Sequence, residues 1–171
     1  MSELTLDRVA PRSGQVAVRD LRAVCDRLAG REHVWRPLLR FDPQARWYTR
    51  LAAAAGWEAW LLTWVPGQAT GPHDHGGSAG AFRVLQGVLT ERTPLGPVHD
   101  GAPVAWRSRV LVAGSTRSFG PEHVHDVEAA GAVPAVSLHV YGPALERMTR
   151  WDVDRRGRLV RLGTERAGAD W

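Results

Sequence analysis

The sequence has only one cysteine, Cys25, and it contains no lysine, isoleucine or asparagine. A single cysteine cannot form a disulfide within the chain, and it excludes metal sites that are built from pairs of cysteines. Because lysine is absent, all 22 basic side chains are arginines. This usage is typical of codon bias, and it indicates no function by itself.

The sequence also lacks long apolar runs. No run approaches the roughly 18 residues that a membrane-spanning helix needs, and residues 1–11 have neither the basic start nor the apolar core of a secretory signal. We therefore expect a cytoplasmic protein with no membrane partner.

Length and charge narrow the class further. A chain of 171 residues fits one domain, 1–171, that is large enough to bury a core. The net charge is +4 and the pI is near 10.4, but the arginines are interspersed with Asp and Glu. This distribution does not favour a nucleic-acid partner, although it is compatible with a small anionic substrate. We expect a monomer.

Residues 1–56 are predicted to form a helical segment. Apolar residues recur at helical spacing over residues 15–28, and Gly30 stands where such a helix would end. Asp42-Pro43 offers the start of a second helix, with an N-cap followed by a proline. The cluster Trp47-Tyr48-Thr49-Arg50 suits an extended segment equally well, so the sequence leaves that boundary open.

Residues 57–145 are predicted to form a barrel of short strands. The segment 57–65 is rich in aromatic and branched side chains and ends at Pro66-Gly67. Short strands at this spacing indicate a mainly β fold, either an antiparallel sandwich or a small barrel. Residues 146–171 are expected to add a C-terminal hairpin at 151–162 and a loose end at 167–171. Further strand-like runs, separated by Gly or Pro, are residues 81–85, 88–93, 104–112, 123–127 and 135–141.

Two histidines between Gly67 and Gly87 form the first chemical motif. Side chains of a strand alternate between its faces, so His73 and His75 are predicted to point the same way, with Asp74 turned from them. Imidazole is the commonest metal ligand, and two imidazoles on one face can occupy adjacent coordination positions. The alternative is a solvated turn with two incidental histidines, but the flanking glycines and the later histidines favour a metal site.

A metal ion needs at least one more protein ligand, which His125 or His123 could supply from a neighbouring strand. We favour His125. Many metal-binding barrels carry a carboxylate at the position of Gly80, so this chain would offer three neutral imidazoles instead. Such ligands suit iron, zinc or copper, and they do not suit magnesium or calcium.

A second motif alternates polar and apolar side chains. Ser137, His139 and Tyr141 are predicted to share one face of a strand, with Leu138 and Val140 on the other. A hydroxyl, an imidazole and a phenol in a row suit the wall of a polar cavity. A solvent-facing edge strand is the alternative.

Residues 48–148 resemble the cysteine dioxygenase family of thiol dioxygenases, and the first motif resembles the cupin signature. The resemblance implies a cupin fold, a small antiparallel β-barrel or jelly roll with N-terminal α-helices. It also implies a mononuclear non-haem Fe(II) and the oxidation of L-cysteine by O2 to cysteine sulfinic acid. The matching segments, in the same order and at nearly the same spacing, are Tyr48-Thr49-Arg50, Trp64, His73-Asp74-His75, Leu85-Gln86-Gly87, His125, Val127-Glu128, Pro134-Ala135-Val136-Ser137-Leu138-His139 and Tyr141.

The resemblance implies the metal ligands and the carboxylate-binding residue. His73, His75 and His125 match the iron ligands, and because they are neutral they would favour binding of the substrate as a thiolate. Arg50 matches the arginine that binds the substrate carboxylate, where a planar guanidinium can form a bidentate, charge-assisted pair. Tyr48 resembles a second phenol on the substrate side, with a structural role as the alternative.

The resemblance also implies a relay in the second motif. Tyr141 matches the phenol that points at the reactants, His139 would orient it, and Ser137 would complete the relay. The role of this relay would be hydrogen bonding to the substrate or oxygen, together with proton management.

Two residues depart from the animal members of the family. Gly80 replaces the cysteine that forms a thioether with the active-site tyrosine, so Tyr141 should be unmodified, and Met148 replaces another cysteine. Relatives that oxidise 3-mercaptopropionate also lack the crosslink, so another small thiol of this kind is an alternative substrate. Arg50 favours cysteine, because the mercaptopropionate-type relatives tend to place their arginine elsewhere. A non-catalytic, metal-binding cupin is the alternative from a different class.

Overall fold

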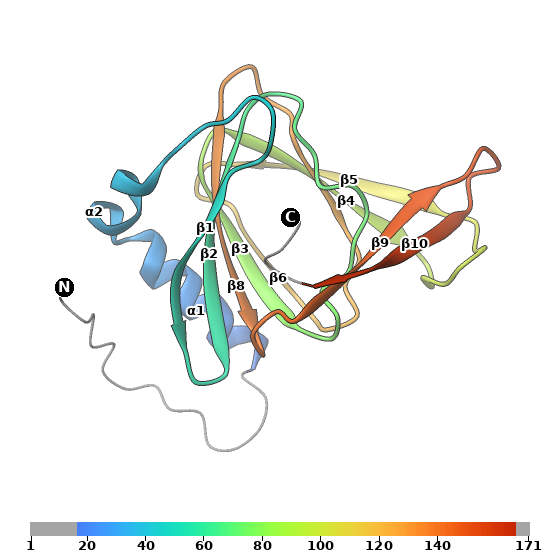
Figure 1. Cartoon of the computed structure of the whole chain (residues 1–171), viewed down its shortest axis with the longest axis horizontal. Coiled ribbons are helices and arrows are strands. Elements are labelled where there is room, and N and C mark those ends of the chain that lie inside the picture. Colours follow the sequence, from blue (N-terminus) through green and yellow to red (C-terminus); the bar gives the residue numbers. More distant parts are fainter. Residues whose placement is uncertain (1–16, 167–171) are drawn as a thin grey trace.

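The computed structural model describes residues 17–166, which form helices on one side of a set of β-sheets (Figure 1). The largest sheet has five strands in the order β1-β2-β8-β3-β6, a second has the order β5-β4-β7, and β9 and β10 pair as a hairpin. The strands of the two larger sheets are β1 (Tyr48–Ala54), β2 (Trp57–Trp64), β3 (Ala79–Gln86), β4 (Val88–Leu95), β5 (Ala105–Val112), β6 (Thr116–Phe119), β7 (Asp126–Ala129) and β8 (Ala135–Gly142).

The inner strands of the five-stranded sheet, β2, β3 and β8, are buried on both faces. Helix α1 (Val18–Ala29) covers the outer face, where Leu21 and Leu28 pack with Ala59, Ala81 and Leu138. Successive side chains of a strand point to opposite faces, so the neighbours of these residues on β2, β3 and β8 point inward. All eight residues of β8 are buried, as its central position in the sheet requires.

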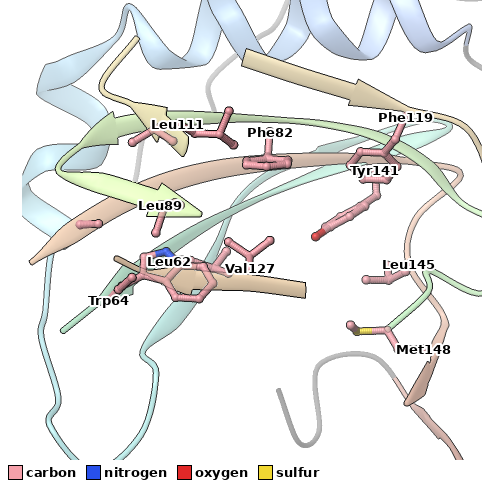
Figure 2. Packing of buried hydrophobic residues seen from close by; sticks show 13 residues of the cluster. Leu62, Trp64, Phe82, Leu89, Leu111, Phe119, Val127, Tyr141, Leu145 and Met148 are labelled. Atoms are coloured by element: carbon pink, nitrogen blue, oxygen red, sulfur yellow. The ribbon is translucent and has the colours of Figure 1, made fainter. Parts of the chain in front are cut away.

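The inner face of this sheet meets the second sheet in the main hydrophobic core (Figure 2). Trp64 and Phe82 come from the five-stranded sheet, and Leu89, Leu111 and Val127 come from the other. This core is a jelly-roll arrangement of mainly antiparallel strands. The predicted fold class, a mainly β cupin with N-terminal helices, is confirmed.

The N-terminal segment combines helices with one strand. Helix α1 begins at Val18 and is followed by Gly30, as the apolar spacing predicts, and α2 (Glu32–Trp35) and η1 (Arg36–Leu38) come next. Asp42-Pro43 does not begin a helix; the chain bends there and enters β1 at Tyr48. The extended alternative for residues 47–50 is therefore right, and the last part of the segment 1–56 is not helical.

Most of the predicted strands are present with small shifts at their ends, and three features differ. The strand predicted at 123–127 begins only at Asp126, as β7. The short strand β6 was not predicted, and the motif His73-Asp74-His75 lies in the irregular connection between β2 and β3 instead of on a strand. Glycines with positive φ at positions 71, 76 and 77 interrupt that connection.

The C-terminal segment forms a hairpin that is longer than the predicted 151–162. Strand β9 (Arg147–Val153) pairs with β10 (Leu159–Arg166) around a turn near Gly157. The predicted loose end at 167–171 lies outside the described residues. Among those that are described, none of the helices has the length and apolar character of a membrane span.

Candidate metal centre

Three histidines from two separate segments come together inside the protein. His73 and His75 belong to the connection before β3, and His125 directly precedes β7. The backbones of His73 and His125 form an isolated antiparallel bridge, in which each amide donates to the other carbonyl, at 2.9 and 3.0 Å. This bridge aligns two segments that are about fifty residues apart in sequence.

Asp74, between the two histidines, fixes the connection through its carboxylate. Its Oδ1 accepts hydrogen bonds from the amides of Gly76, at 2.9 Å, and Thr149, at 3.1 Å. Gly76 has φ +57, and a Cβ there would lie 2.5 Å from the Arg147 carbonyl oxygen. The sequence His-Asp-His-Gly therefore folds into a turn that presents both imidazoles to the same place.

The three imidazoles form a compact, buried cluster. The ring centroids lie 5.1 Å apart for His73 and His75, 4.7 Å for His73 and His125, and 5.0 Å for His75 and His125. All three side chains are buried, and one nitrogen of each lies within 4.8 Å of the others. The structure thus brings together the three residues that were predicted as metal ligands.

Hydrogen bonds leave at least one nitrogen of each ring for a metal. Nδ1 of His73 donates to the carbonyl of Gly71 at 2.9 Å, and Nδ1 of His125 donates to Glu91 at 3.0 Å. Neither nitrogen of His75 has a hydrogen-bond partner, although both are buried. Because an unpaired buried polar atom is costly, these residues fit a metal ion, which would bind the free nitrogen of each ring.

The electrostatics of the cluster favour neutral imidazoles. Burial lowers the pKa of His73 and His75 well below the usual value, and the neighbouring His125 lowers each of them further. Burial also lowers the pKa of His125. Neutral imidazole is the form that binds metals, so the rings are ready as ligands near neutral pH.

Sequence reasoning missed Glu91, which lies behind the cluster. Its buried carboxylate accepts hydrogen bonds from His125, from His123 at 3.2 Å and from Arg117 at 2.7 Å. Burial acts to raise the pKa of Glu91, but the three donors outweigh it and hold the pKa well below its usual value. A signal for Glu91 existed in the sequence, since it shares the inward face of β4 with Leu89.

His123 does not join the three-histidine cluster, which agrees with the preference for His125. It contacts the same Oε1 of Glu91 as His125, and its ring stacks on Phe119, with ring centroids 4.8 Å apart. Glu91, His123 and His125 form a second group with metal-binding atoms. Because the Glu91 carboxylate is already occupied by Arg117 and both rings, this group serves to hold His125 in place.

The polar face of β8 lines the same interior. Nε1 of Trp64 donates to Oγ of Ser137 at 2.9 Å, Oγ of Ser137 lies 2.8 Å from Nε2 of His139, and Nδ1 of His139 lies 3.3 Å from the phenol oxygen of Tyr141. All four side chains are buried. The ring of Tyr141 lies 5.2 Å from that of His75. The predicted cavity wall is therefore an interior wall that reaches the histidine cluster, and the edge-strand alternative is wrong.

The hydrogen bonds of this face link four side chains in a row. An indole N–H can only donate, so Oγ of Ser137 accepts from Trp64. Burial keeps His139 neutral by lowering its pKa, so one of its ring nitrogens carries a proton and the other accepts. If Ser137 donates to Nε2, the Nδ1–H faces Tyr141; if Nε2 carries the proton, Tyr141 donates to Nδ1. Burial raises the pKa of Tyr141 above its usual value, so the phenol keeps its proton.

The predicted substrate-side residues lie on β1. Across the sheet, Tyr48 pairs with Leu62 of β2, and Leu62 pairs with Ser137 of β8. In the same way, Arg50 pairs with Trp60, and Trp60 pairs with His139. Directly paired residues of neighbouring strands point to the same face, so both side chains leave β1 on the inner side. The side chain of Arg50 is 61% exposed, and its guanidinium lies 4.0 Å from the buried carboxylate of Glu58.

Gly80 stands directly opposite Tyr141 in the sheet. A Cβ at this position would lie 2.4 Å from the ring of Phe119. Phe119 also stacks on His75, with ring centroids 4.7 Å apart. The space beside Tyr141 is therefore filled by an aromatic ring.

Comparisons with solved structures show the same fold. A Thermus thermophilus protein shares 23% identity over 64% of this chain and 93% of its own, with a TM-score of 0.54. A Klebsiella pneumoniae protein with a double-stranded β-helix domain shares 18% identity over 63% of this chain and 85% of its own, with a TM-score of 0.53. A cupin superfamily protein from Desulfitobacterium hafniense shares 14% identity over 64% of this chain and 87% of its own, with a TM-score of 0.50. The fold is that of a cupin.

The family follows from the sequence. A sequence model of the family "Cysteine dioxygenase type I" matches residues 10–154. The chain therefore belongs to the cysteine dioxygenase type I family, and the resemblance found in its motifs is confirmed. No curated protein sequence matches the chain.

Proposed function

We propose that the protein is a non-haem Fe(II) thiol dioxygenase that converts L-cysteine and O2 to cysteine sulfinic acid. In this reaction the thiol sulfur is oxidised, O2 is reduced, and both oxygen atoms end in the product. The observation that carries the proposal is the buried cluster of three neutral imidazoles in a chain of the cysteine dioxygenase family. His73, His75 and His125 would hold the metal ion.

The Fe(II) ion would supply a Lewis-acidic centre at which a thiolate and O2 can meet. The chain itself supplies an enclosed environment for this chemistry. His75 and His125 are almost completely buried, with 0% and 1% exposure, which keeps bulk water from the cluster. Exclusion of water also strengthens each charge interaction in the site.

The substrate would be held by residues of β1. Arg50 is proposed to bind the carboxylate of cysteine, and Tyr48 is proposed to line the substrate side. Both leave β1 on the inner face of the sheet, in register with the polar residues of β8, which supports these roles. Binding of an acid by Arg50 would compete with its weak contact to Glu58.

The residues of β8 would act on the reactants through Tyr141. With its proton on Nδ1, His139 would donate to Tyr141, and the phenol would donate its own hydrogen to a bound reactant. Ser137 would fix the ring of His139 in this role. These are the proposed catalytic residues, and their buried, hydrogen-bonded row beside His75 supports these roles.

Oxygen consumption with iron-loaded protein tests the proposal. Cysteine is expected to support turnover, and His125→Ala is expected to abolish both iron binding and activity. His33→Ala, which removes an exposed histidine, is the control. Turnover of 3-mercaptopropionate without turnover of cysteine would show that 3-mercaptopropionate is the substrate and that cysteine is not. Tight iron binding with no oxidation of any thiol would favour a non-catalytic, metal-binding cupin instead.

A further inference from the structure

One face of the β9–β10 hairpin lines an open cavity of about 770 Å³. Met148 belongs to the main core, so its neighbours Arg147 and Thr149 leave β9 on the opposite face. Trp151 continues this face, and Arg161 of β10 shares it because the two residues are directly paired. None of the three clustered histidines lines the cavity. It lies on the outer side of β9 and is distinct from the candidate metal centre.

Two of the loops around the cavity are hydrogen bonded to the hairpin, which projects from the barrel in Figure 1. In the connection before β3, the amide of Asp74 donates to the carbonyl of Thr149, and the amide of Thr149 donates to Oδ1 of Asp74, both at 3.1 Å. In the loop between β4 and β5, Asp100 accepts from the amide of Arg161 at 2.9 Å. The cavity is therefore preformed, and its volume is in the range of small-molecule sites.

The cavity contains charges of both signs that do not neutralise each other. Arg147 and Arg161 come from the hairpin, whereas Asp74 and Glu122 come from two loops. Among residues 17–166, none of these four side chains forms an ion pair. A simple anion or cation would be attracted by one pair and repelled by the other. A ligand with both charges can be attracted by all four groups.

Apolar surface and hydroxyl groups accompany these charges. Val98 and the indole of Trp151 are half-buried in the lining, and Val124 is buried. Thr149 and Thr164 place two hydroxyl oxygens 3.5 Å apart on the same face of the hairpin. The cavity can therefore hold an apolar group beside the two charges of a ligand.

We propose that this cavity binds a small zwitterion, an α-amino acid with an apolar side chain. Its carboxylate would pair with Arg147 and Arg161, whose guanidinium groups offer planar forks of N–H donors. Its ammonium group, with three donors, would pair with Asp74 and Glu122. Its side chain would pack on Trp151. This site goes beyond the proposed function, because such a ligand needs no thiol and is not oxidised.

Anaerobic equilibrium dialysis of iron-loaded protein tests the proposal, with radiolabelled L-leucine as the probe. Two unlabelled analogues compete with it: isocaproate, which lacks the ammonium group, and isoamylamine, which lacks the carboxylate. Each analogue loses the charged contacts on one side of the ligand, and each exposed contact contributes about two- to fivefold. We expect both to bind about fivefold more weakly than leucine, or weaker still.

Variants at the two ends of the ligand should have opposite selectivity. In Arg161→Met, the dissociation constants of leucine and isocaproate are expected to rise about two- to fivefold, while that of isoamylamine stays the same. In Glu122→Gln, those of leucine and isoamylamine should rise by a similar factor, while that of isocaproate stays the same. Both side chains are exposed, so neither change removes core packing.

Arg155→Met and Glu128→Gln are the matched controls, because they remove exposed charges outside the cavity and should leave all three constants unchanged. His125→Ala, which removes a candidate metal ligand, should also keep the affinity for leucine. Loss of leucine binding in His125→Ala would place the amino acid at the metal and overturn the proposal. So would a wild type that binds leucine no more tightly than its analogues, or an Arg161→Met variant that weakens all three ligands equally.

These measurements are independent of the proposed function. A protein that binds leucine in this pattern but oxidises no thiol would refute the dioxygenase and retain the cavity as an amino-acid site. A protein that oxidises cysteine but does not bind leucine would retain the dioxygenase and refute the amino-acid site.

Discussion

The carboxylate of Glu91 accepts a hydrogen bond from Nδ1 of His125 at 3.0 Å. This contact fixes the tautomer of the imidazole, because the nitrogen that donates to a carboxylate must carry the proton. Nε2 is then left as the nitrogen that can bind a metal. A residue on β4 thus determines the orientation of a ligand that precedes β7, the strand with which β4 pairs.

Glu91→Gln is expected to weaken metal binding without abolishing it. The amide keeps the size of the side chain but loses the charge that makes His125 a better ligand, and such changes typically raise the metal dissociation constant by about 10- to 100-fold. Titration against a chromophoric chelator measures this constant. Glu128→Gln, at an exposed position of β7, is the control. Equal affinity in both variants would show that Glu91 does not support the ligand.

Gly80→Ala is expected to destabilise the protein because Phe119 occupies the space that a Cβ needs. Overpacking of a core costs about 1 to 3 kcal/mol. The double variant Gly80→Ala, Phe119→Leu should recover part of the loss, since the smaller side chain can move away. Urea unfolding measures both, with Gly120→Ala as the control, where a Cβ would meet no other atom. This explanation would be contradicted if the double variant lost as much stability as Gly80→Ala and Phe119→Leu do together when each is measured alone.

The metal ligands could be predicted from sequence because they are encoded locally. His73 and His75 are two residues apart, and glycines mark the turn around them. The strand of Ser137, His139 and Tyr141 is equally local, because its alternation alone places all three side chains on one face. Local periodicity, together with the family's motifs, was sufficient for most of the strands and for the fold class.

The supporting residues could not be predicted because they depend on pairing between distant segments. The alternation of β4 places Glu91 on the inward face, but nothing near it in sequence indicates that His125 lies opposite it. The ambiguity of residues 47–50 has the same cause. These residues form a strand because β2 provides the partner, and tertiary pairing outweighs local propensity.

Cys25 is expected to make stability fall at alkaline pH. Its buried thiol contacts the carbonyl of Leu138 at 3.6 Å, and burial raises its pKa to about 12. The thiol of the unfolded chain titrates near pH 8.5, so above that pH unfolding releases a proton and becomes more favourable until the pH approaches the raised pKa. Between about pH 8.5 and 10.5 this linkage removes about 2 kcal/mol from the free energy of unfolding.

Urea unfolding of the wild type and of Cys25→Ala over this pH range measures the effect. The difference between the two proteins isolates the thiol, and the absence of lysine removes the groups that usually dominate alkaline titration. The free energy of unfolding of Cys25→Ala should depend less on pH than that of the wild type. Parallel curves for the two proteins would show that the thiol titrates alike in the folded and unfolded chains.

His139 is expected to carry its proton on Nδ1 and not on Nε2. Oγ of Ser137 accepts from Trp64, and its own hydrogen can be directed to Nε2 of His139, which lies 2.8 Å away. In that arrangement Nδ1 carries the proton and faces the Tyr141 oxygen at 3.3 Å. Long-range proton–nitrogen NMR spectra of metal-free protein distinguish the two tautomers. In Ser137→Ala the donor to Nε2 is lost, and both tautomers should become populated. Ser118→Ala, which removes a buried hydroxyl that has no hydrogen-bond partner, should leave the spectrum of His139 unchanged. A wild-type ring protonated on Nε2 would reverse the chain of hydrogen bonds and make Tyr141 donate to His139 instead of to a substrate.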